Sequence, residues 1–217
     1  MTKDQIISNT TSFVQKTLKN AEGGHDWFHT LRVYTNAKTI LKTETADAFV
    51  VELASLLHDI ADSKFHNGNE DLGPQKATAF LETQSVDAEV ISHVVNIIKN
   101  VSYKGGHNSS GFHSIELNIV QDADRLDALG AIGIARTFNF GGFKNNPLYD
   151  PEIPANLNQS KEEYKKSNAP TLNHFYEKLL LLKDKMHTKT ARNIALHRHD
   201  FMVNYLEQFY KEWEGKL

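Results

Sequence analysis

The sequence contains no cysteine, and this absence restricts the chemistry that the protein can perform. Disulfide bonds and thiolate metal ligands are both excluded. A metal ion would therefore have to be held by imidazole and carboxylate groups. The chain carries 11 histidines and 27 acidic residues that could supply them.

The chain also has little that would point to a membrane or to nucleic acid. No stretch approaches the ~20 apolar residues of a membrane-spanning helix. Lys3, Asp4 and Gln5 interrupt the N-terminal segment where a secretory leader would be apolar. The net charge is −3 and no basic stripe is visible, whereas strong nonspecific binding to nucleic acid normally requires one. We expect a cytoplasmic protein with no stable membrane or nucleic-acid partner.

Apolar residues recur with the period of an α-helix through most of the chain. Between residues 50 and 57 they occupy positions i, i+3, i+4 and i+7. No run alternates with period two between hairpin signals. The sequence therefore predicts an all-α fold. The apolar faces that we expect are Val50, Leu53, Ala54 and Leu57; Leu31, Tyr34, Ala37 and Leu41; Ile91, Val94, Val95, Ile98 and Val101; and Ala195, Met202, Leu206, Phe209 and Trp213.

Capping residues and prolines indicate where helices begin and where they are interrupted. Asp26 and Asp87 each precede an apolar helical stretch and are typical N-cap residues. Four of the five prolines lie in residues 139–170, among glycine and asparagine. So long a loop usually forms a lid, a partner surface or a disordered segment. We predict one domain over residues 1–217, with its core at about 20–138, the loop or lid at 139–170 and C-terminal helices at 171–217.

Three helical segments each carry histidine or aspartate among apolar residues. They read HDWFHTLRV at 25–33, LLHDIADSKF at 56–65 and QDADRLD at 121–127. A buried carboxylate beside a buried imidazole is unfavourable by several kcal/mol unless a cation or hydrogen bonds compensate it. A divalent cation would do so and would keep positions open for water and substrate. A hydrogen-bonded network without metal is the alternative. The residues alone do not separate Asp122 from Asp124.

The ordered pattern H…HD…D resembles the HD superfamily of metal-dependent phosphohydrolases. The three runs, with the third continued as QDADRLDALGAIGIARTF, are similar to a single-domain bacterial branch that includes a nucleotide pyrophosphohydrolase. The similarity extends to TARNIALHRHDFM near the C-terminus. This resemblance implies an HD-domain helical bundle with additional C-terminal helices. It also implies one divalent metal ion with the ligands His29, His58, Asp59 and Asp124, the last because the family run reads A-D-R-L.

The identity of the metal is left open by these ligands. Imidazole–carboxylate sites accept Mn, Mg, Fe, Co or Ni, and we favour Mn or Mg. Some HD proteins bind a second metal through further histidines, and His93 could take that role here. We favour a single metal, with His93 as a histidine of the core or of a cleft.

Asp62 and Lys64 follow the HD pair and are candidate catalytic residues. Asp62 lies three residues after Asp59 and is our candidate general base or leaving-group acid. Lys64 could contact phosphate oxygens. The alternatives are a surface carboxylate at the helix end for Asp62 and a partner of the helix dipole for Lys64.

Arg32 and Asp127 each lie three residues after a predicted ligand. Arg32 is placed to meet phosphate oxygens, or to pair with a ligand carboxylate instead. Asp127 could support Asp124 or serve as an extra ligand. Lys104 and Arg198 are candidate substrate-binding residues, Arg198 through the resemblance alone.

The resemblance implies hydrolysis of a phosphoester or phosphoanhydride in a small phosphorylated substrate. Nucleotide as the substrate class, cleaved by a pyrophosphohydrolase or phosphatase, rests on family analogy. The alternative is a metal-bound, nucleotide-sensing or regulatory HD domain without turnover. Dioxygen chemistry at two irons is a third hypothesis and would need His93 or another histidine as a ligand. The apolar C-terminal helix could support a homodimer.

Overall fold

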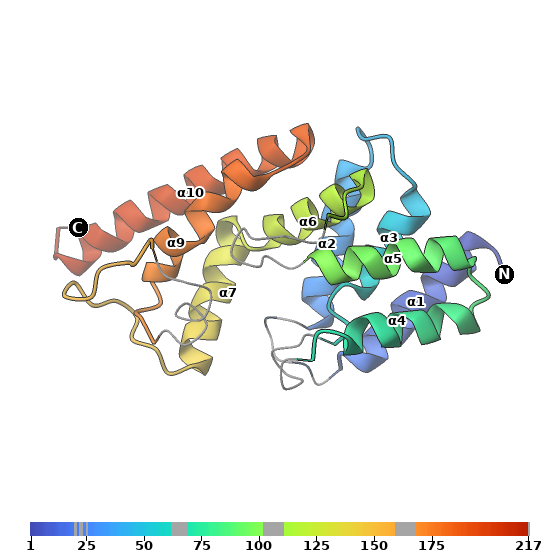
Figure 1. Cartoon of the computed structure of the whole chain (residues 1–217). Helices are drawn as coiled ribbons and strands as arrows, with labels where there is room; N and C mark the ends of the chain where they lie inside the picture. The colour runs from blue at the N-terminus through green and yellow to red at the C-terminus, as the bar shows by residue number, and fades with distance from the viewer. Residues whose placement is uncertain are drawn as a thin grey trace. The chain divides into compact units, whose positions relative to one another are not determined.

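The computed structural model describes residues 1–19, 21, 24, 26–61, 69–101, 111–158 and 168–216. These residues form helices, turns and irregular segments, and none of them lies in a β-strand (Figure 1). The predicted all-α fold is therefore confirmed. The chain forms two compact units, Met1–Asp124 and Arg125–Leu217, and the division falls within one helix. None of the helices among these residues is long and apolar enough to cross a bilayer.

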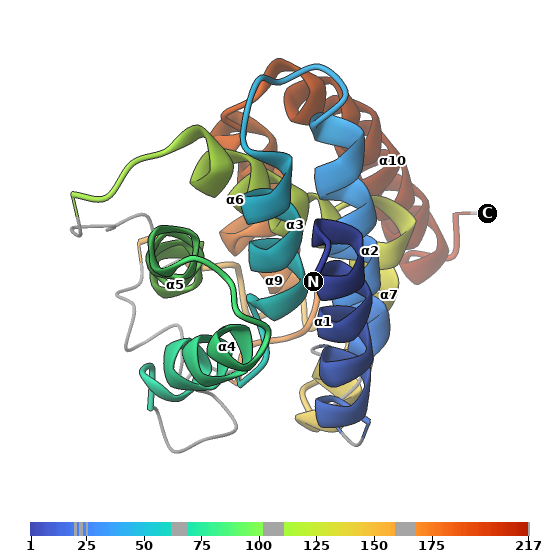
Figure 2. The same ribbon diagram turned by 90° about the vertical axis from the view of Figure 1, so that its right-hand side faces the viewer.

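Helix α3 is the centre of the N-terminal unit. It packs against α1, α2 and α5, while α4 lies beside α5 (Figure 2). Seven of its ten residues are buried, so it is apolar on nearly every side. Its start is fixed by Asp47, whose side chain accepts hydrogen bonds from the Phe49 and Val50 amides. The helices of this unit are α1 (Lys3–Thr17), α2 (Trp27–Ile40), α3 (Ala48–Leu57), α4 (Leu72–Thr83), α5 (Ala88–Val101) and most of α6 (Ile115–Asp127).

The start of α2 is as predicted, but its buried face is not. Asp26 is the N-cap and accepts a hydrogen bond from the His29 amide at 2.8 Å. The predicted face began with Leu31, which is 38% exposed. The face that is buried consists of His29, Thr30, Val33, Ala37 and Ile40. The buried face contains two polar residues, His29 and Thr30, so the pattern of apolar residues alone indicated a different face of the helix.

The C-terminal unit contains α7 (Gly130–Phe143), α9 (Asn173–Glu177), the 3-10 helix η2 (Leu179–Lys185) and α10 (Lys189–Trp213). Helix α10 packs against α7 and η2. It buries Ala195, Met202 and Leu206, as its apolar spacing predicts, and also Ala191, whereas Phe209 is only partly buried and Trp213 is 51% exposed.

The segment expected to be a loop at 139–170 begins later than predicted, because α7 continues to Phe143. Its described parts are fastened to the same unit. The Thr171 amide donates to the Pro147 carbonyl at 2.8 Å, and the Leu172 amide donates to Leu148 at 3.2 Å. Asn173 Nδ2 donates to the Ile153 carbonyl at 3.0 Å. These bonds join the described residues before position 159 to those around Thr171.

Candidate metal centre

Two histidines and an aspartate converge at the end of α3. His29 comes from the first turn of α2, His58 caps the C-terminus of α3, and Asp59 follows it. One ligand atom from each lies within 4.8 Å of the others. His29 Nε2 is 3.2 Å from His58 Nε2 and 3.5 Å from Asp59 Oδ2, and His58 Nε2 is 3.8 Å from Asp59 Oδ2.

Asp124 approaches the same group from α6. Its Oδ1 lies 3.6 Å from His29 Nε2, and its side chain is 31% exposed. Asp122, by contrast, is completely buried. The residue pattern had left these two aspartates equivalent, and the resemblance had favoured Asp124. The structure places the Asp124 carboxylate near His29, and its role as a ligand stays a prediction.

The surroundings of the two histidines follow from the helices that carry them. The capping bond from Asp26 begins α2 at Trp27, so His29 lies in its first turn and is only 1% exposed. His58 ends the most deeply buried helix of the unit and is 7% exposed. Imidazoles at these depths need polar partners, because an unpaired buried polar group is costly.

The orientation of the His58 ring is fixed by the backbone. Its Nδ1 lies 2.8 Å from the Ser55 carbonyl oxygen. A carbonyl only accepts, so Nδ1 is the donor in this bond, and Nε2 is the ring atom that faces His29 and could bind a cation. This is the usual arrangement of a metal-ligating histidine.

His29, His58 and Asp59 fit a divalent cation by their chemistry and spacing, and Asp124 is the candidate fourth ligand through its approach to His29. Two nitrogens that each lie about 2.1 Å from one ion at a right angle would be about 3.0 Å apart. The observed His29–His58 separation of 3.2 Å is close to this value. Neutral imidazole nitrogen and carboxylate oxygen together suit Mn, Fe, Co, Ni or Zn, and carboxylates suit Mg as well.

A hydrogen bond between α2 and α3 supports this framework. The Tyr34 hydroxyl donates to Glu52 Oε2 at 2.6 Å. Burial raises the pKa of Tyr34, and the hydrogen bond and negative charge of Glu52 act in the same direction. The phenol therefore stays protonated well above neutral pH and keeps donating.

Helix α6 is held to its neighbours by three further bonds. Each joins a side chain of α2 or α6 to a backbone atom of another segment. They are Asn36 Nδ2 to the Ala123 carbonyl at 3.1 Å, Gln121 Nε2 to the Asn100 carbonyl at 2.8 Å, and the Asp47 amide to Glu116 Oε1 at 3.0 Å.

Asp127 and Arg198 have structural contacts within the C-terminal unit. Asp127 is 2% exposed and pairs with Arg136 Nη1 at 2.8 Å. Arg198 donates from Nη1 to the Leu126 carbonyl at the end of α6. Burial lowers the pKa of Arg198, and the charge of Asp127 opposes that shift. These contacts cap α6. A catalytic role for Asp127 and a substrate-binding role for Arg198 remain predictions.

Arg198 also accounts for a glycine at the start of α7. Gly130 has a φ of +73°, and a Cβ at this position would lie 3.1 Å from Arg198 Cγ. Glycine is therefore favoured here for both its backbone conformation and its lack of a side chain.

Several predicted residues lie outside the part of the chain that the structure describes. These are Asp62 and Lys64 in residues 62–68 and Lys104 in residues 102–110. Arg32 is described and lies half-buried on α2. The catalytic and substrate-binding roles of these four residues remain predictions.

His93 lies outside the group of metal-type ligands found among the described residues. Its Nε2 is 3.1 Å from Ser114 Oγ and 3.5 Å from Glu116 Oε2, and its ring meets Phe112 edge-on at 5.8 Å. It lines a groove of about 570 Å³. This position agrees with a cleft-lining histidine.

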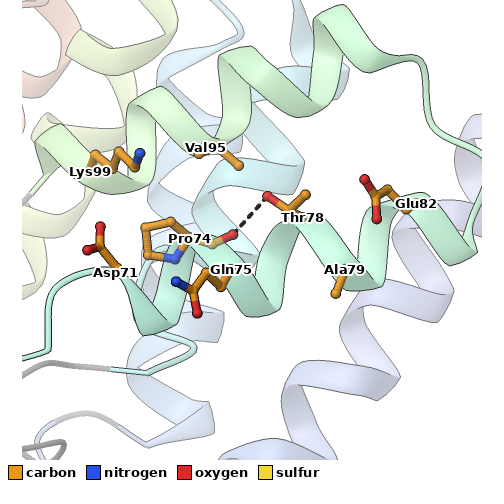
Figure 3. A pocket seen from close by; sticks show the side chains of 8 residues that line it. All are labelled: Asp71, Pro74, Gln75, Thr78, Ala79, Glu82, Val95 and Lys99. Atoms are coloured by element: carbon orange, nitrogen blue, oxygen red, sulfur yellow. Dashed lines mark hydrogen bonds between the residues drawn. The ribbon is translucent and has the colours of Figure 1, made fainter.

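A second groove lies between α4 and α5 (Figure 3). Its volume is about 310 Å³, and Thr78, which lines it, donates to the Pro74 carbonyl of its own helix at 3.0 Å. Asp71 and Lys99 lie toward one end and Glu82 toward the other (Figure 3). None of the four candidate ligands lines this groove.

Sequence reasoning missed the contacts that hold the ligands in place. The contact from the Ser55 carbonyl could not be predicted, because every residue has a backbone carbonyl and the residue types give no indication of which one is used. Asn36 could have been found, because it lies seven residues after His29 and so two turns further along the same face of α2. Tyr34 had been assigned to the apolar face, and its bond to Glu52 was not foreseen.

Comparisons with known proteins agree with the resemblance drawn from the motifs. The model of the HD domain family matches residues 27–129. YpgQ of Bacillus subtilis is 39% identical over 205 residues, which cover 94% of this chain and 92% of that protein.

Solved structures share the fold over nearly the whole chain. An HD-superfamily hydrolase from Bacillus thuringiensis is 44% identical, with a TM-score of 0.77, and the match covers 98% of this chain and 99% of the other. The structure of B. subtilis YpgQ in complex with ADP has a TM-score of 0.75 and 36% identity, and the match covers 97% of each chain.

Proposed function

This chain belongs to the HD superfamily, and from that premise we propose that it is a metal-dependent phosphohydrolase that cleaves a phosphoester or phosphoanhydride bond in a nucleotide. The observation that carries the proposal is the convergence of His29, His58 and Asp59, with Asp124 beside them. The bond from His58 Nδ1 to the Ser55 carbonyl supports it further, since this bond leaves Nε2 ready to bind a cation.

The four side chains would hold one divalent cation, with Mn or Mg favoured. When bound, such a cation polarises a phosphoryl oxygen and lowers the pKa of a coordinated water. His29 and His58 contribute no charge as neutral ligands, so the two aspartates leave the bound divalent site close to neutral. Additional positive groups are therefore needed to bind a phosphate.

Residues around the ligands are proposed to supply the rest of the chemistry. Arg32 lies one helical turn from His29 and could bind phosphate oxygens. Lys64 and Lys104 are proposed to do the same. Asp62 is proposed to take or return the proton. Removal of any one of these four side chains is therefore expected to lower activity while metal binding is retained.

Nucleotide as the substrate class is supported by the relative YpgQ, whose structure has been solved with ADP. ADP contains one phosphoanhydride bond between its two phosphoryl groups and one phosphoester bond to the ribose. A nucleotide pyrophosphohydrolase and a nucleotide phosphatase would both recognise such a molecule.

The test is the release of phosphate and pyrophosphate from a panel of nucleoside mono-, di- and triphosphates. The protein is first stripped with a chelator and then assayed after addition of Mn²⁺ or Mg²⁺. We expect metal-restored release from one substrate class, and its loss in His58→Ala and Asp124→Ala. His197→Ala is the matched control, because His197 is an exposed histidine on α10. Full activity in both ligand variants would refute the assignment.

A nucleotide-binding regulator without turnover is the second candidate. The ADP complex of YpgQ favours it as well, because a bound nucleotide is compatible with sensing. Under this alternative, nucleotide would bind in a metal-dependent manner and be recovered unchanged after long incubation.

A further inference from the structure

Helices α2 and α6 are joined at two points that lie two turns apart on α2. At the first, His29 Nε2 approaches Asp124 Oδ1 at 3.6 Å. At the second, Asn36 Nδ2 donates to the Ala123 carbonyl at 3.1 Å. The two α2 residues are seven positions apart, or about 10 Å along the helix axis. The two α6 residues are adjacent in the chain.

The bond from Asn36 restrains movements of α6 that the approach of His29 to Asp124 does not restrain. A helix held at one point can rotate about its axis or slide along its neighbour. Rotation of α6 would swing the Asp124 carboxylate, because one residue corresponds to about 100° around a helix. A bond to the backbone at Ala123 limits both movements, since the acceptor belongs to the helix itself and not to a mobile side chain.

Metal coordination makes such a restraint important. Ligand distances in a metal site must lie within about 0.2 Å of their ideal values. His58 and Asp59 are adjacent in the chain, and the Ser55 carbonyl orients the His58 ring. Asp124 comes from a different helix and has a partly exposed side chain. Its position therefore depends on how α6 is held.

We propose that Asn36 is a positioning residue for the metal centre and acts through Asp124. The inference rests on the proposed function, in that it takes Asp124 to be a ligand. Asn36 does not touch the cation. It sets the rotation and height of α6 so that the carboxylate reaches the position facing His29. Removal of its amide is expected to weaken metal affinity by about 10–100-fold, as for other groups that orient ligands.

The experiment measures Mn²⁺ affinity by titration, with the bound ion followed by electron paramagnetic resonance, and requires no turnover. Asn36→Leu removes the donor at nearly constant size. Asn173→Leu is the matched control, because the Asn173 amide also donates to a backbone carbonyl, that of Ile153, at a place away from α6. We expect weaker binding and a changed spectrum in Asn36→Leu, and near wild-type binding in Asn173→Leu. Equal losses in both variants would overturn the proposal, since they would show a general effect of destabilisation.

A double-mutant cycle separates action through Asp124 from any other route. Asp124→Ala should still bind Mn²⁺ weakly through the remaining three ligands. In that background Asn36→Leu should cost no further affinity. Additive losses would overturn the proposal while leaving the metal centre intact. If the wild-type protein bound no Mn²⁺, the proposed function would fail and the role of Asn36 with it.

Discussion

The two units of the chain differ in the histidines that they bury. Among the described residues, the buried histidines His29 and His58 both lie in the N-terminal unit, where side chains also form hydrogen bonds between helices. The C-terminal unit relies on aromatic rings and close glycine contacts. Phe175 packs against Phe138 and Tyr205 at ring-centroid distances of 5.9 and 6.2 Å.

The units differ in their exposed surface as well. Among the described residues, the exposed large apolar side chains number three in the N-terminal unit and ten in the C-terminal unit. The three are Met1, Phe28 and Leu31. The apolar residues of the N-terminal unit thus enclose the polar side chains at which we propose the metal centre. The C-terminal unit is expected to respond to packing changes more than to metal.

The largest expected effect is in the aromatic core of the C-terminal unit. Phe175 is completely buried, so Phe175→Ala should lower the free energy of unfolding by about 3–5 kcal/mol. Urea denaturation followed by circular dichroism measures this loss. The contrasting change is Phe201→Ala, because Phe201 is 53% exposed and should contribute little. Equal losses in both would contradict the assignment of Phe175 to the core.

Metal should stabilise the protein through the N-terminal unit. At a free Mn²⁺ concentration of 100 times the dissociation constant, the gain is about 2.7 kcal/mol and is lost on chelation. Thermal unfolding with and without metal measures it. His58→Ala should abolish the shift, and Phe175→Ala should retain it. A shift of equal size in His58→Ala would place the bound metal elsewhere.

Adjacent glycines near the end of α7 provide a matched pair. A Cβ at Gly141 would lie 2.1 Å from Thr171 Oγ1, whereas one at Gly142 meets nothing within 4 Å. Gly141→Ala should destabilise by about 1–3 kcal/mol because the site is already filled. Gly142→Ala should stabilise by up to about 1 kcal/mol, since alanine favours the helix. Both values come from denaturant unfolding, and the same sign for the two variants would refute the packing argument.

The smallest effect is expected at alkaline pH, from the bond between Tyr34 and Glu52. Because the pKa of Tyr34 is raised in the folded state, the unfolded chain loses its phenolic proton first. The contribution of this tyrosine to stability is therefore complete below about pH 10 and declines as pH rises above it. Above pH 10 the free energy of unfolding should fall by less than about 1.4 kcal/mol per pH unit, because the Tyr34 ring is only half-buried.

Tyr34→Phe tests this pH dependence. The variant should be less stable than wild type by about 1–2 kcal/mol at pH 7, with the difference narrowing above pH 10. Urea unfolding at several pH values gives both numbers. A difference that stayed constant with pH would exclude Tyr34 as the titrating group.

The helices could be predicted from the sequence more fully than the contacts between them. Periodicity located α3 and α5, and Asp26 marked the start of α2. The prediction of the buried face of α2 was wrong. His29 and Thr30 belong to that face, and a pattern of apolar residues does not include them. Gly141 and Gly142 suggested a loop, yet Gly141 lies in a helix where Thr171 leaves no room for a side chain. That constraint is tertiary and has no local signal.

The ligand set was likewise predictable only in part. Spacing found the three segments that carry the candidate ligands, because adjacent histidine and aspartate are conspicuous in apolar helices. It could not choose between Asp122 and Asp124, which differ in direction around α6 and hence in burial. Asn36 was missed because its partner is a backbone carbonyl, which every residue possesses.

The carbonyl oxygen that orients His58 belongs to Ser55, and the Ser55 side chain takes no part in that bond. Ser55 is completely buried, and its hydroxyl has no hydrogen-bond partner among the described residues. The main chain thus sets the orientation of His58. The side chain at position 55 does not, so other residues that are small enough to fit could replace serine there. Substitutions at position 55 could accumulate in a lineage without altering the direction in which His58 presents its nitrogen.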